Sequence, residues 1–306
     1  MRKPPRKAGV RFCQVLNQDD MTVSGGLGAI EKALHLLDFF GQGQSTQSLT
    51  ELSKASGVSK ATCHRTLRVL QQYGLVDREG DGYRLGYRIL ELAAHVKSSI
   101  EPWNVGMDLM DRLRDEVDQS VQLVVRDGCH GIYVEVLPAS SPARLYVRPG
   151  RRAPLYAGAS TRLLLAALDD DEVLAILGEL KLHPLTDRTP RSETEVLAKL
   201  RTVRETWCAL SLGEMEPYSA ELALPIIGAR GRVVGALSVA GAERHYLARE
   251  SLQSLLVALD AAALGISRRL GFDVAWPTRP EVFLSLCDEG SPLPADSSLT
   301  KTAPRA

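Results

Sequence analysis

The stretch TELSKASGVSKATCHRTLRVL, from Thr50 to Leu70, decides how this chain of 306 residues is interpreted. It contains two short helical patterns separated by Gly57-Val58-Ser59. Glycine suits the left-handed residue that ends a helix, because it has no Cβ to clash with the backbone. Ser59 then stands at an N-cap position, where its hydroxyl can accept a hydrogen bond from a backbone N–H. The stretch predicts two helices joined by a sharp turn, the second running from about Lys60 to Tyr73.

The second helix is predicted to have one apolar face and one polar face. Cys63, Thr66, Leu67 and Leu70 fall on one side and should pack on neighbouring helices. The other sides carry short donors and cations. In a helix-turn-helix, such a helix enters the major groove of DNA with its N-terminus first. The predicted DNA-contacting residues are Ser59, Lys60, Thr62, His64 and Arg65. The solvated face of an ordinary helical hairpin is the alternative for this stretch alone.

The neighbouring sequence favours a winged helix. Upstream, Ile30, Ala33, Leu34 and Leu37 have helical spacing. Downstream, LVDREGDGYRL (residues 75–85) reads as two short strands around a glycine-rich tip, which is typical of a hairpin. Three helices followed by a hairpin make a winged helix, which we assign to residues 25–86. Arg78 and Arg84 stand where a wing meets the DNA backbone, and Arg84 joins the predicted DNA-binding set. A linker helix is predicted over residues 87–97.

The charge distribution also points to nucleic acid at the front of the chain. The net charge is zero, yet the first 90 residues carry thirteen Lys or Arg against eight Asp or Glu, and the remainder carries twenty-four against twenty-nine. A basic front and an acidic back suggest that only the front meets a polyanion. Residues 1–24 are predicted to be a flexible basic arm. The expected partner is double-stranded DNA; a winged helix that binds protein and no operator DNA is the alternative.

Several classes of protein are disfavoured by the sequence. The five cysteines form no C-x-x-C pair, which argues against a disulfide framework or a zinc ribbon and fits the cytoplasm. No apolar run approaches the ~20 residues that span a bilayer, and no secretory signal begins the chain. Gly158-Ala159-Ser160 is followed by Thr161-Arg162 and so is no nucleophile elbow, and the six histidines lack metal-ligand spacings. We expect no membrane association, no enzyme activity, no cofactor and no metal.

The remainder of the chain mixes both periodicities. VQLVVRDG (121–128), GIYVEV (131–136) and RLYVRPG (144–150) read as strands, and LALPIIGARGRVVGALSV (222–239) reads as a hairpin. Helices are predicted between them and up to Gly271. This mixture predicts an α+β domain over residues 98–271. From Phe272 onward the chain has five prolines and little periodicity, so residues 272–306 are predicted to be a disordered tail.

Three stretches together resemble the IclR family of transcriptional regulators. They are residues 49–86, GRRAPLYAGASTRLLLAAL (150–168) and SLGEMEPYSAELALPIIGARGRVVGALSVAG (211–241), in this order and spacing. The resemblance covers about Gly26 to Gly271. It implies a winged helix-turn-helix that binds palindromic operator DNA, joined to a GAF-like domain that binds a small-molecule effector. It also implies a homodimer or homotetramer that represses or activates transcription.

The resemblance further implies an effector site in the second domain. The backbone N–H groups of Ala159 and Ser160, at the start of a helix, would bind an effector carboxylate, as helix N-termini bind anions. The small residue Gly158 would let the ligand approach, although close packing of helix on sheet explains it equally well. Leu155 would form an apolar wall, and Ser238 would donate a hydroxyl.

Three further positions depart from family members that bind small oxoacids. Ser211 stands where an acid can occur, Glu221 where Cys, Ser or Ala occurs, and Ala240 replaces a serine. If Glu221 points into the pocket, it disfavours a small dianion, because like charges at short range weaken binding. The expected effector is then a small organic acid with a donor group, such as an amino or hydroxy acid. The alternative is that Glu221 pairs with a nearby arginine.

Overall fold

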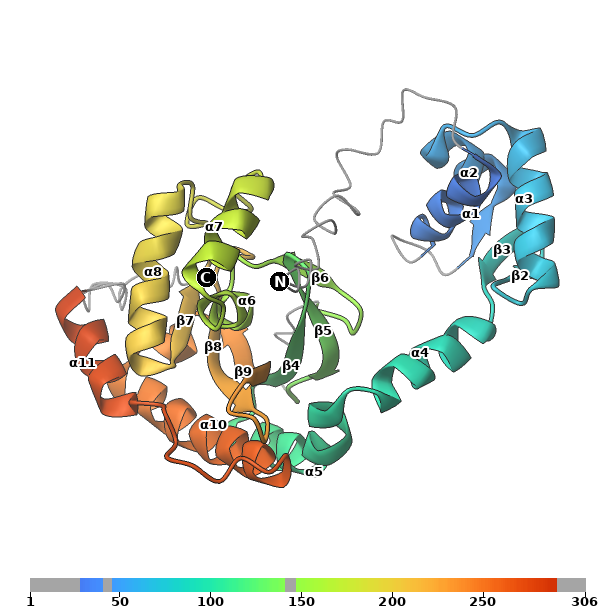
Figure 1. Ribbon diagram of the computed structural model, residues 1–306. Helices are drawn as coiled ribbons and strands as arrows, with labels where there is room; N and C mark the ends of the chain where they lie inside the picture. The colour runs from blue at the N-terminus through green and yellow to red at the C-terminus, as the bar shows by residue number, and fades with distance from the viewer. Residues whose placement is uncertain (1–27, 41–45, 141–146, 291–306) are drawn as a thin grey trace, which may run out of the picture. The chain divides into compact units, whose positions relative to one another are not determined.

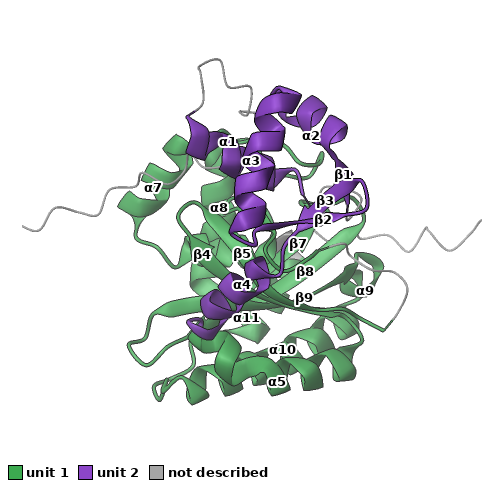
Figure 2. Cartoon of the chain, turned by 90° about the vertical axis from the view of Figure 1, so that its right-hand side faces the viewer, with its two compact units in different colours: residues 1–14, 101–306 green, residues 15–100 purple. Residues whose placement is uncertain are grey.

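The computed structural model describes residues 28–40, 46–140 and 147–290. The described residues up to Ile100 belong to one compact unit, unit 2, and those from Glu101 onward belong to another, unit 1 (Figures 1 and 2). The predicted basic arm of residues 1–24 and the last part of the predicted tail, residues 291–306, lie outside the described residues.

Unit 2 contains a three-helix winged helix, as predicted, followed by the helix α4 in the predicted linker segment. Its helices and strands are α1 (Ala29–Asp38), β1 (Gln47–Ser48), α2 (Leu49–Ser56), α3 (Lys60–Gln72), β2 (Val76–Glu79), β3 (Gly82–Leu85) and α4 (Arg88–Ser98). The strands form an antiparallel sheet in the order β1-β3-β2, with β2 and β3 as the wing. Leu36, Leu52, Cys63 and Leu67 lie fully buried at the centre of its core. The apolar spacing of the sequence therefore corresponds to one continuous core.

The turn between α2 and α3 is built as the sequence predicts. Gly57 ends α2 with φ at 68°, in the left-handed region that favours glycine. The hydroxyl of Ser59 accepts a hydrogen bond from the Thr62 N–H and caps α3. A reciprocal capping box of Ser48 and Glu51 opens α2. These local contacts determine where α3 begins.

Unit 1 is an α+β domain around one antiparallel sheet. Its elements are α5 (Glu101–Val117), β4 (Ser120–Asp127), β5 (His130–Leu137), β6 (Arg152–Pro154), α6 (Ala159–Ala166), α7 (Asp170–Glu179), α8 (Glu193–Thr206), β7 (Ala209–Leu212), β8 (Ser219–Ile227), β9 (Val233–Ala242), α9 (Arg244–Leu247), α10 (Arg249–Arg269) and α11 (Pro280–Gly290). The strand order is β6-β5-β4-β9-β8-β7. Helices α5 and α10 pack on one face of the sheet and α6 packs on the other (Figure 1).

Helix α10 is a core helix of unit 1. Among the described residues it is the one helix long and apolar enough to cross a membrane by length and composition alone. Its residues Leu252, Leu256, Leu259 and Ile266 are buried, and the helix contacts α5 and strand β8. The apolar side of α10 therefore faces protein.

Two strand assignments from the sequence need correction. The predicted strand at 144–150 lies partly outside the described residues, and its described part, 147–150, is irregular and ends in a turn; the strand follows at Arg152–Pro154. Strand β7, Ala209–Leu212, was missed, because four residues at a sheet edge leave too short a pattern to recognise.

The predicted disorder of the tail is wrong for residues 272–290. This segment contains α11, and Phe272, Phe283 and Cys287 are buried. Asp260 of α10 accepts hydrogen bonds from the indole of Trp276 at 2.8 Å and from the Thr278 hydroxyl at 2.6 Å. The two prolines in this segment do not break structure, because one lies in the connection and Pro280 opens the helix, where no N–H is needed.

Candidate functional site

The predicted DNA-contacting side chains of α3 lie together on its outer surface. Ser59, Lys60, His64 and Arg65 are exposed, and Thr62 is half-buried. The Thr62 hydroxyl accepts hydrogen bonds from the Ser59 hydroxyl at 3.0 Å and from the Arg65 guanidinium at 3.4 Å. The opposite face of the helix is held in the core by Cys63 and Leu67. The N-terminal half of α3 thus presents donors and cations to solvent, and the helix contains no acidic residue.

The two arginines of the wing, Arg84 and Arg78, have different surroundings. Arg84 is half-buried and forms ion pairs with Asp77 at 3.4 Å and with Glu79 at 4.0 Å. Its guanidinium also lies 4.7 Å from the centre of the Tyr87 ring. Arg78 is exposed beside the wing tip, where it donates to the Gly80 carbonyl at 3.4 Å. Arg78 has no acidic partner among the described residues, so it is better placed than Arg84 to meet a phosphate.

In unit 1, sheet register brings the predicted effector-site residues of three strands onto one face. Glu221 on β8 lies between Ser211 on β7 and Ala240 on β9. Two residues before Ala240 on β9, Ser238 lies opposite Gln122 of β4. The Ser238 hydroxyl donates a hydrogen bond to the Gln122 amide oxygen at 3.4 Å. Because side chains alternate along a strand, both rows face α6.

Glu221 binds the N-terminus of α6. The Ala159 N–H donates to its Oε2 at 2.8 Å, and the Ser160 hydroxyl donates to its Oε1 at 2.5 Å. Glu221 is 7% exposed. The Ala159 N–H, predicted to be free for an effector carboxylate, therefore already binds Glu221 in this structure. The alternative, an arginine partner, does not hold, because Glu221 forms no ion pair within the described residues. A negative charge is stable there because a helix N-terminus carries partial positive charge.

Gly158 and Leu155 have structural roles at this point. Gly158 has φ at 91°, and an added Cβ would lie 3.0 Å from the Thr161 hydroxyl and 3.3 Å from Glu221 Oε2. Glycine is required by both the backbone conformation and the close approach of the carboxylate. Leu155 is fully buried in the apolar core that covers this face of the sheet. It is not among the residues that line the neighbouring cavity.

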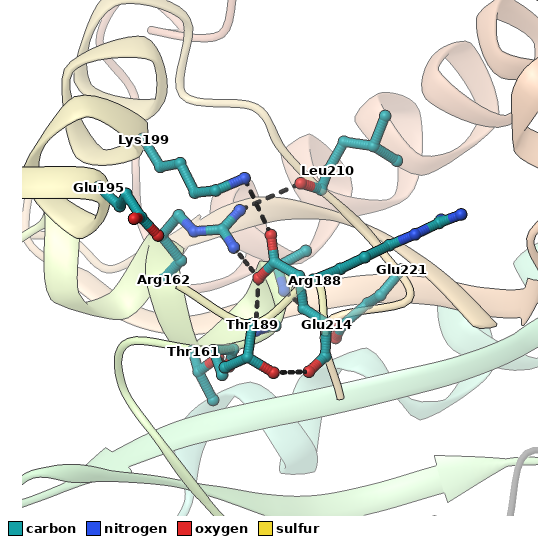
Figure 3. Close-up of polar contacts among 12 residues, drawn as sticks. Thr161, Arg162, Arg188, Thr189, Glu195, Lys199, Leu210, Glu214 and Glu221 are labelled. Atoms are coloured by element: carbon teal, nitrogen blue, oxygen red, sulfur yellow. Dashed lines mark hydrogen bonds and ion pairs between the residues drawn. The ribbon is translucent and has the colours of Figure 1, made fainter. Parts of the chain in front are cut away.

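Beside this point lies a buried ion cluster around Glu214 (Figure 3). Arg162 of α6 is 2% exposed and Glu214 is 3% exposed, and the two form an ion pair. Lys199 of α8 reaches the other oxygen of Glu214 at 3.0 Å, and the Gly158 N–H donates to this carboxylate at 3.2 Å. Arg162 also donates to the Leu210 carbonyl at 3.1 Å, while its Nε has no partner among the described residues. The cluster ties α6 to α8 and to strand β7.

The role of Glu214 was not predicted from the sequence. A signal was present, because Arg162 is the one charged residue in the helix ASTRLLLA, and a charge in an apolar helix needs a buried partner. Glu214 lies 52 positions further along the chain, and nothing local connects the two residues.

A small cavity opens next to Glu221. Its volume is about 30 Å³, and it is lined by Gln122, Tyr133, Val147, Arg151, Ser211, Met215, Glu216, Ser219, Ala220, Glu221 and Ala240. A cavity of this size holds water but not an organic molecule, since one water needs roughly 10–15 Å³ of such space. Arg151 pairs with Glu216 at 2.8 Å. Burial, and next the charge of Glu221, raises the pKa of Tyr133 well above its ordinary value, so its hydroxyl remains a neutral donor.

The side chains of the lining carry hydrogen-bonding groups of the kind that bind an organic molecule once the cavity is larger. Among residues 28–40, 46–140 and 147–290, no three His, Cys, Asp or Glu side chains gather closely enough to hold a metal ion. The polar atoms that line the cavity belong to hydroxyls, an amide, one guanidinium and two carboxylates. These groups can form hydrogen bonds with the donors and acceptors of a small molecule.

Comparison with known proteins agrees with this organisation. A family model described as the IclR helix-turn-helix domain matches residues 29–80, and one described as the C-terminal domain of the bacterial transcriptional regulator IclR matches residues 95–268. The chain is 32% identical over 244 residues to the HTH-type transcriptional regulator KipR of Bacillus subtilis, an alignment that covers 79% of this chain and 97% of KipR.

Solved structures show the same fold. A putative transcriptional regulator from Rhodococcus sp. RHA1 aligns with a TM-score of 0.70 at 28% identity, over 80% of this chain and 98% of that one. An IclR homologue from Microbacterium hydrocarbonoxydans, solved in complex with 4-hydroxybenzoate, aligns with a TM-score of 0.70 at 21% identity, over 79% of this chain and 99% of that one. With a winged helix in unit 2 and the matching α+β domain in unit 1, the chain belongs to the IclR family of DNA-binding transcriptional regulators.

Proposed function

We propose that α3 and the wing bind palindromic double-stranded operator DNA through Ser59, Lys60, Thr62, His64 and Arg65, with Arg78 as the phosphate contact of the wing. The observation that carries this proposal is the exposed face of α3, which combines donors and cations with no acidic residue. Arg84 is assigned to the internal structure of the wing, because it is already paired with Asp77.

Replacement of Arg65 by alanine is expected to weaken binding to the specific operator by about 1–3 kcal/mol, which is roughly 5- to 150-fold. Arginine makes two parallel hydrogen bonds to guanine in the major groove, and alanine makes none. The measurement is a mobility-shift titration at fixed salt, with the region upstream of this protein's own gene and a random duplex of the same length.

The matched control is Arg230→Ala, which removes an exposed cation from the β8–β9 turn of unit 1. It should leave the affinity for both duplexes unchanged. An equal loss for Arg65→Ala on specific and random DNA would mark Arg65 as a phosphate contact. Unchanged affinity on both would remove Arg65 from the interface.

We infer that the protein acts as a homodimer or homotetramer in the cytoplasm and that it is a regulator and not an enzyme. A palindromic operator requires two recognition helices about 34 Å apart, or a multiple of that distance, and one chain supplies a single α3. Apolar side chains of unit 2 support self-association: Ile30 of α1 is 77% exposed, and Leu34, Leu90 and Leu92 are also exposed. The side chains of Leu90 and Leu92 belong to the predicted linker helix, α4.

Sedimentation at micromolar concentration is expected to show dimers or tetramers. Association at this concentration requires about −8 kcal/mol, which the burial of several large apolar side chains can supply. Ile30→Glu should shift the distribution toward monomer, because it places a charge within the apolar contact. A single species of about 33 kDa for the unmodified chain would contradict the assembly.

We place the effector in unit 1, at the cavity beside Glu221. The support is a convergence of hydroxyl, amide and charged groups on a buried face of the sheet. A cavity of about 30 Å³ must open to admit an organic molecule. An effector that binds one arrangement of unit 1 more tightly than another would change operator affinity by that difference.

A further inference from the structure

The anion position at the start of α6 is filled from within the chain. The Glu221 carboxylate accepts the Ala159 N–H on one oxygen and the Ser160 hydroxyl on the other. The N–H of the preceding residue, Gly158, donates to the Glu214 carboxylate. Both carboxylates are buried. Glu214 lies between β7 and β8 and Glu221 lies on β8, each more than 50 residues after the α6 residue that it binds. The N–H groups of Gly158 and Ala159 and the hydroxyl of Ser160 are therefore already engaged by carboxylates of the chain.

We propose that Glu221 is a built-in anion of the sensor, which takes the place of a ligand carboxylate at α6 and restricts the effectors of this protein to molecules that donate hydrogen bonds beside it. This inference rests on the proposed function of unit 1 as an effector sensor. Small carboxylates that bind at Ala159 and Ser160 are then excluded as effectors. The binding mode that the sequence suggested, an amino or hydroxy acid with its carboxylate at these two residues, is excluded with them.

The charges around the cavity support this restriction. Glu221 and Glu216 both line it, and Arg151, the one cation that lines it among the described residues, is paired with Glu216. A second carboxylate would be repelled by Glu221 at short range. Each oxygen of Glu221 uses one hydrogen bond at α6 and retains acceptor capacity. A hydroxyl or amino group of a ligand can use that capacity.

Removal of the built-in anion provides a direct test. Glu221→Ala deletes a CH₂–COO⁻ group, and acetate is this same group with one added hydrogen. Acetate is therefore expected to bind the variant saturably and to raise its Tm by about 3–6 °C at ten times its dissociation constant. The wild-type protein should show no rise beyond that produced by sodium chloride at equal ionic strength. The probes are acetate and formate, applied to the full chain in a thermal-shift titration.

Two variants control for general effects. Ser211→Ala removes a hydroxyl from the same cavity without freeing the α6 donors or a cation, so it should gain no acetate response. Ser160→Ala combined with Glu221→Ala removes one of the two donors and should weaken the acetate response several-fold. If Glu221→Ala does not fold in chloride buffer, the yield of soluble protein refolded in acetate and in chloride gives the same comparison, with a higher yield in acetate expected.

The proposal is overturned if acetate acts on Glu221→Ala no more than chloride does, in stability and in refolding yield. It is also overturned if acetate or pyruvate stabilises the wild type saturably. The readout involves no DNA, so it is separate from the proposed function. If acetate stabilises Glu221→Ala, the built-in anion is supported. If, in addition, no small molecule changes the operator affinity of the wild type, that result counts against the role of unit 1 as an effector sensor.

Discussion

Replacement of Arg162 by methionine is expected to destabilise unit 1 by about 3–5 kcal/mol. The substitution leaves the buried Glu214 carboxylate without its buried partner, and its remaining cation, Lys199, is 42% exposed. A charge that is removed from water and only partly compensated is costly. The measurement is urea denaturation followed by circular dichroism, with the loss read from the transition midpoint at constant slope.

A double variant and a surface control separate charge from packing. Arg162→Met combined with Glu214→Gln should recover a large part of the loss, because no uncompensated charge remains. Arg191→Met breaks the exposed pair of Arg191 with Asp187 and should cost less than about 1 kcal/mol. If Arg162→Met costs no more than Arg191→Met, the buried cluster does not stabilise the fold.

Replacement of Leu67 by alanine is expected to abolish operator binding by unfolding unit 2. Leu67 is fully buried where α3 packs on the other helices, and large-to-alanine substitutions at such sites cost about 2–5 kcal/mol. A core of fewer than about 80 residues rarely supplies more than 3–5 kcal/mol, so this loss is comparable to the whole stability of the unit. Mobility shift measures the loss of binding, and limited proteolysis locates the unfolding.

The effect should be confined to the part of the chain before Glu101. Cleavage of Leu67→Ala is expected within residues 46–100, while unit 1 stays resistant. Gln71→Ala, an exposed position on the same helix, is the matched control and should retain both binding and resistance. Unchanged operator affinity of Leu67→Ala would contradict the described packing of α3.

The winged helix could be predicted closely because its signals are local. Gly57, Ser59 and the apolar spacing of Cys63 and Leu67 each act within a few residues, and the structure places the turn, the cap and the core accordingly. The start of α8 is of the same kind, since Ser192 accepts the N–H of Glu195 three residues later. Backbone conformation and helix periodicity depend on near neighbours, so sequence alone is sufficient for them.

The partners of Glu221, Arg162 and Arg84 were decided only by tertiary structure. The sequence identified Glu221 as unusual but not that it binds Ala159 and Ser160, about 60 residues before it. It singled out Arg84 on the wing but not the Asp77 that cross-strand register places opposite it. Register and helix packing bring distant residues within hydrogen-bonding range, and a buried charge takes whichever partner they supply, because desolvation makes an unpaired charge too costly. Residue types thus determined which positions need a partner, and the three-dimensional arrangement of sheet and helices determined which partner each one has.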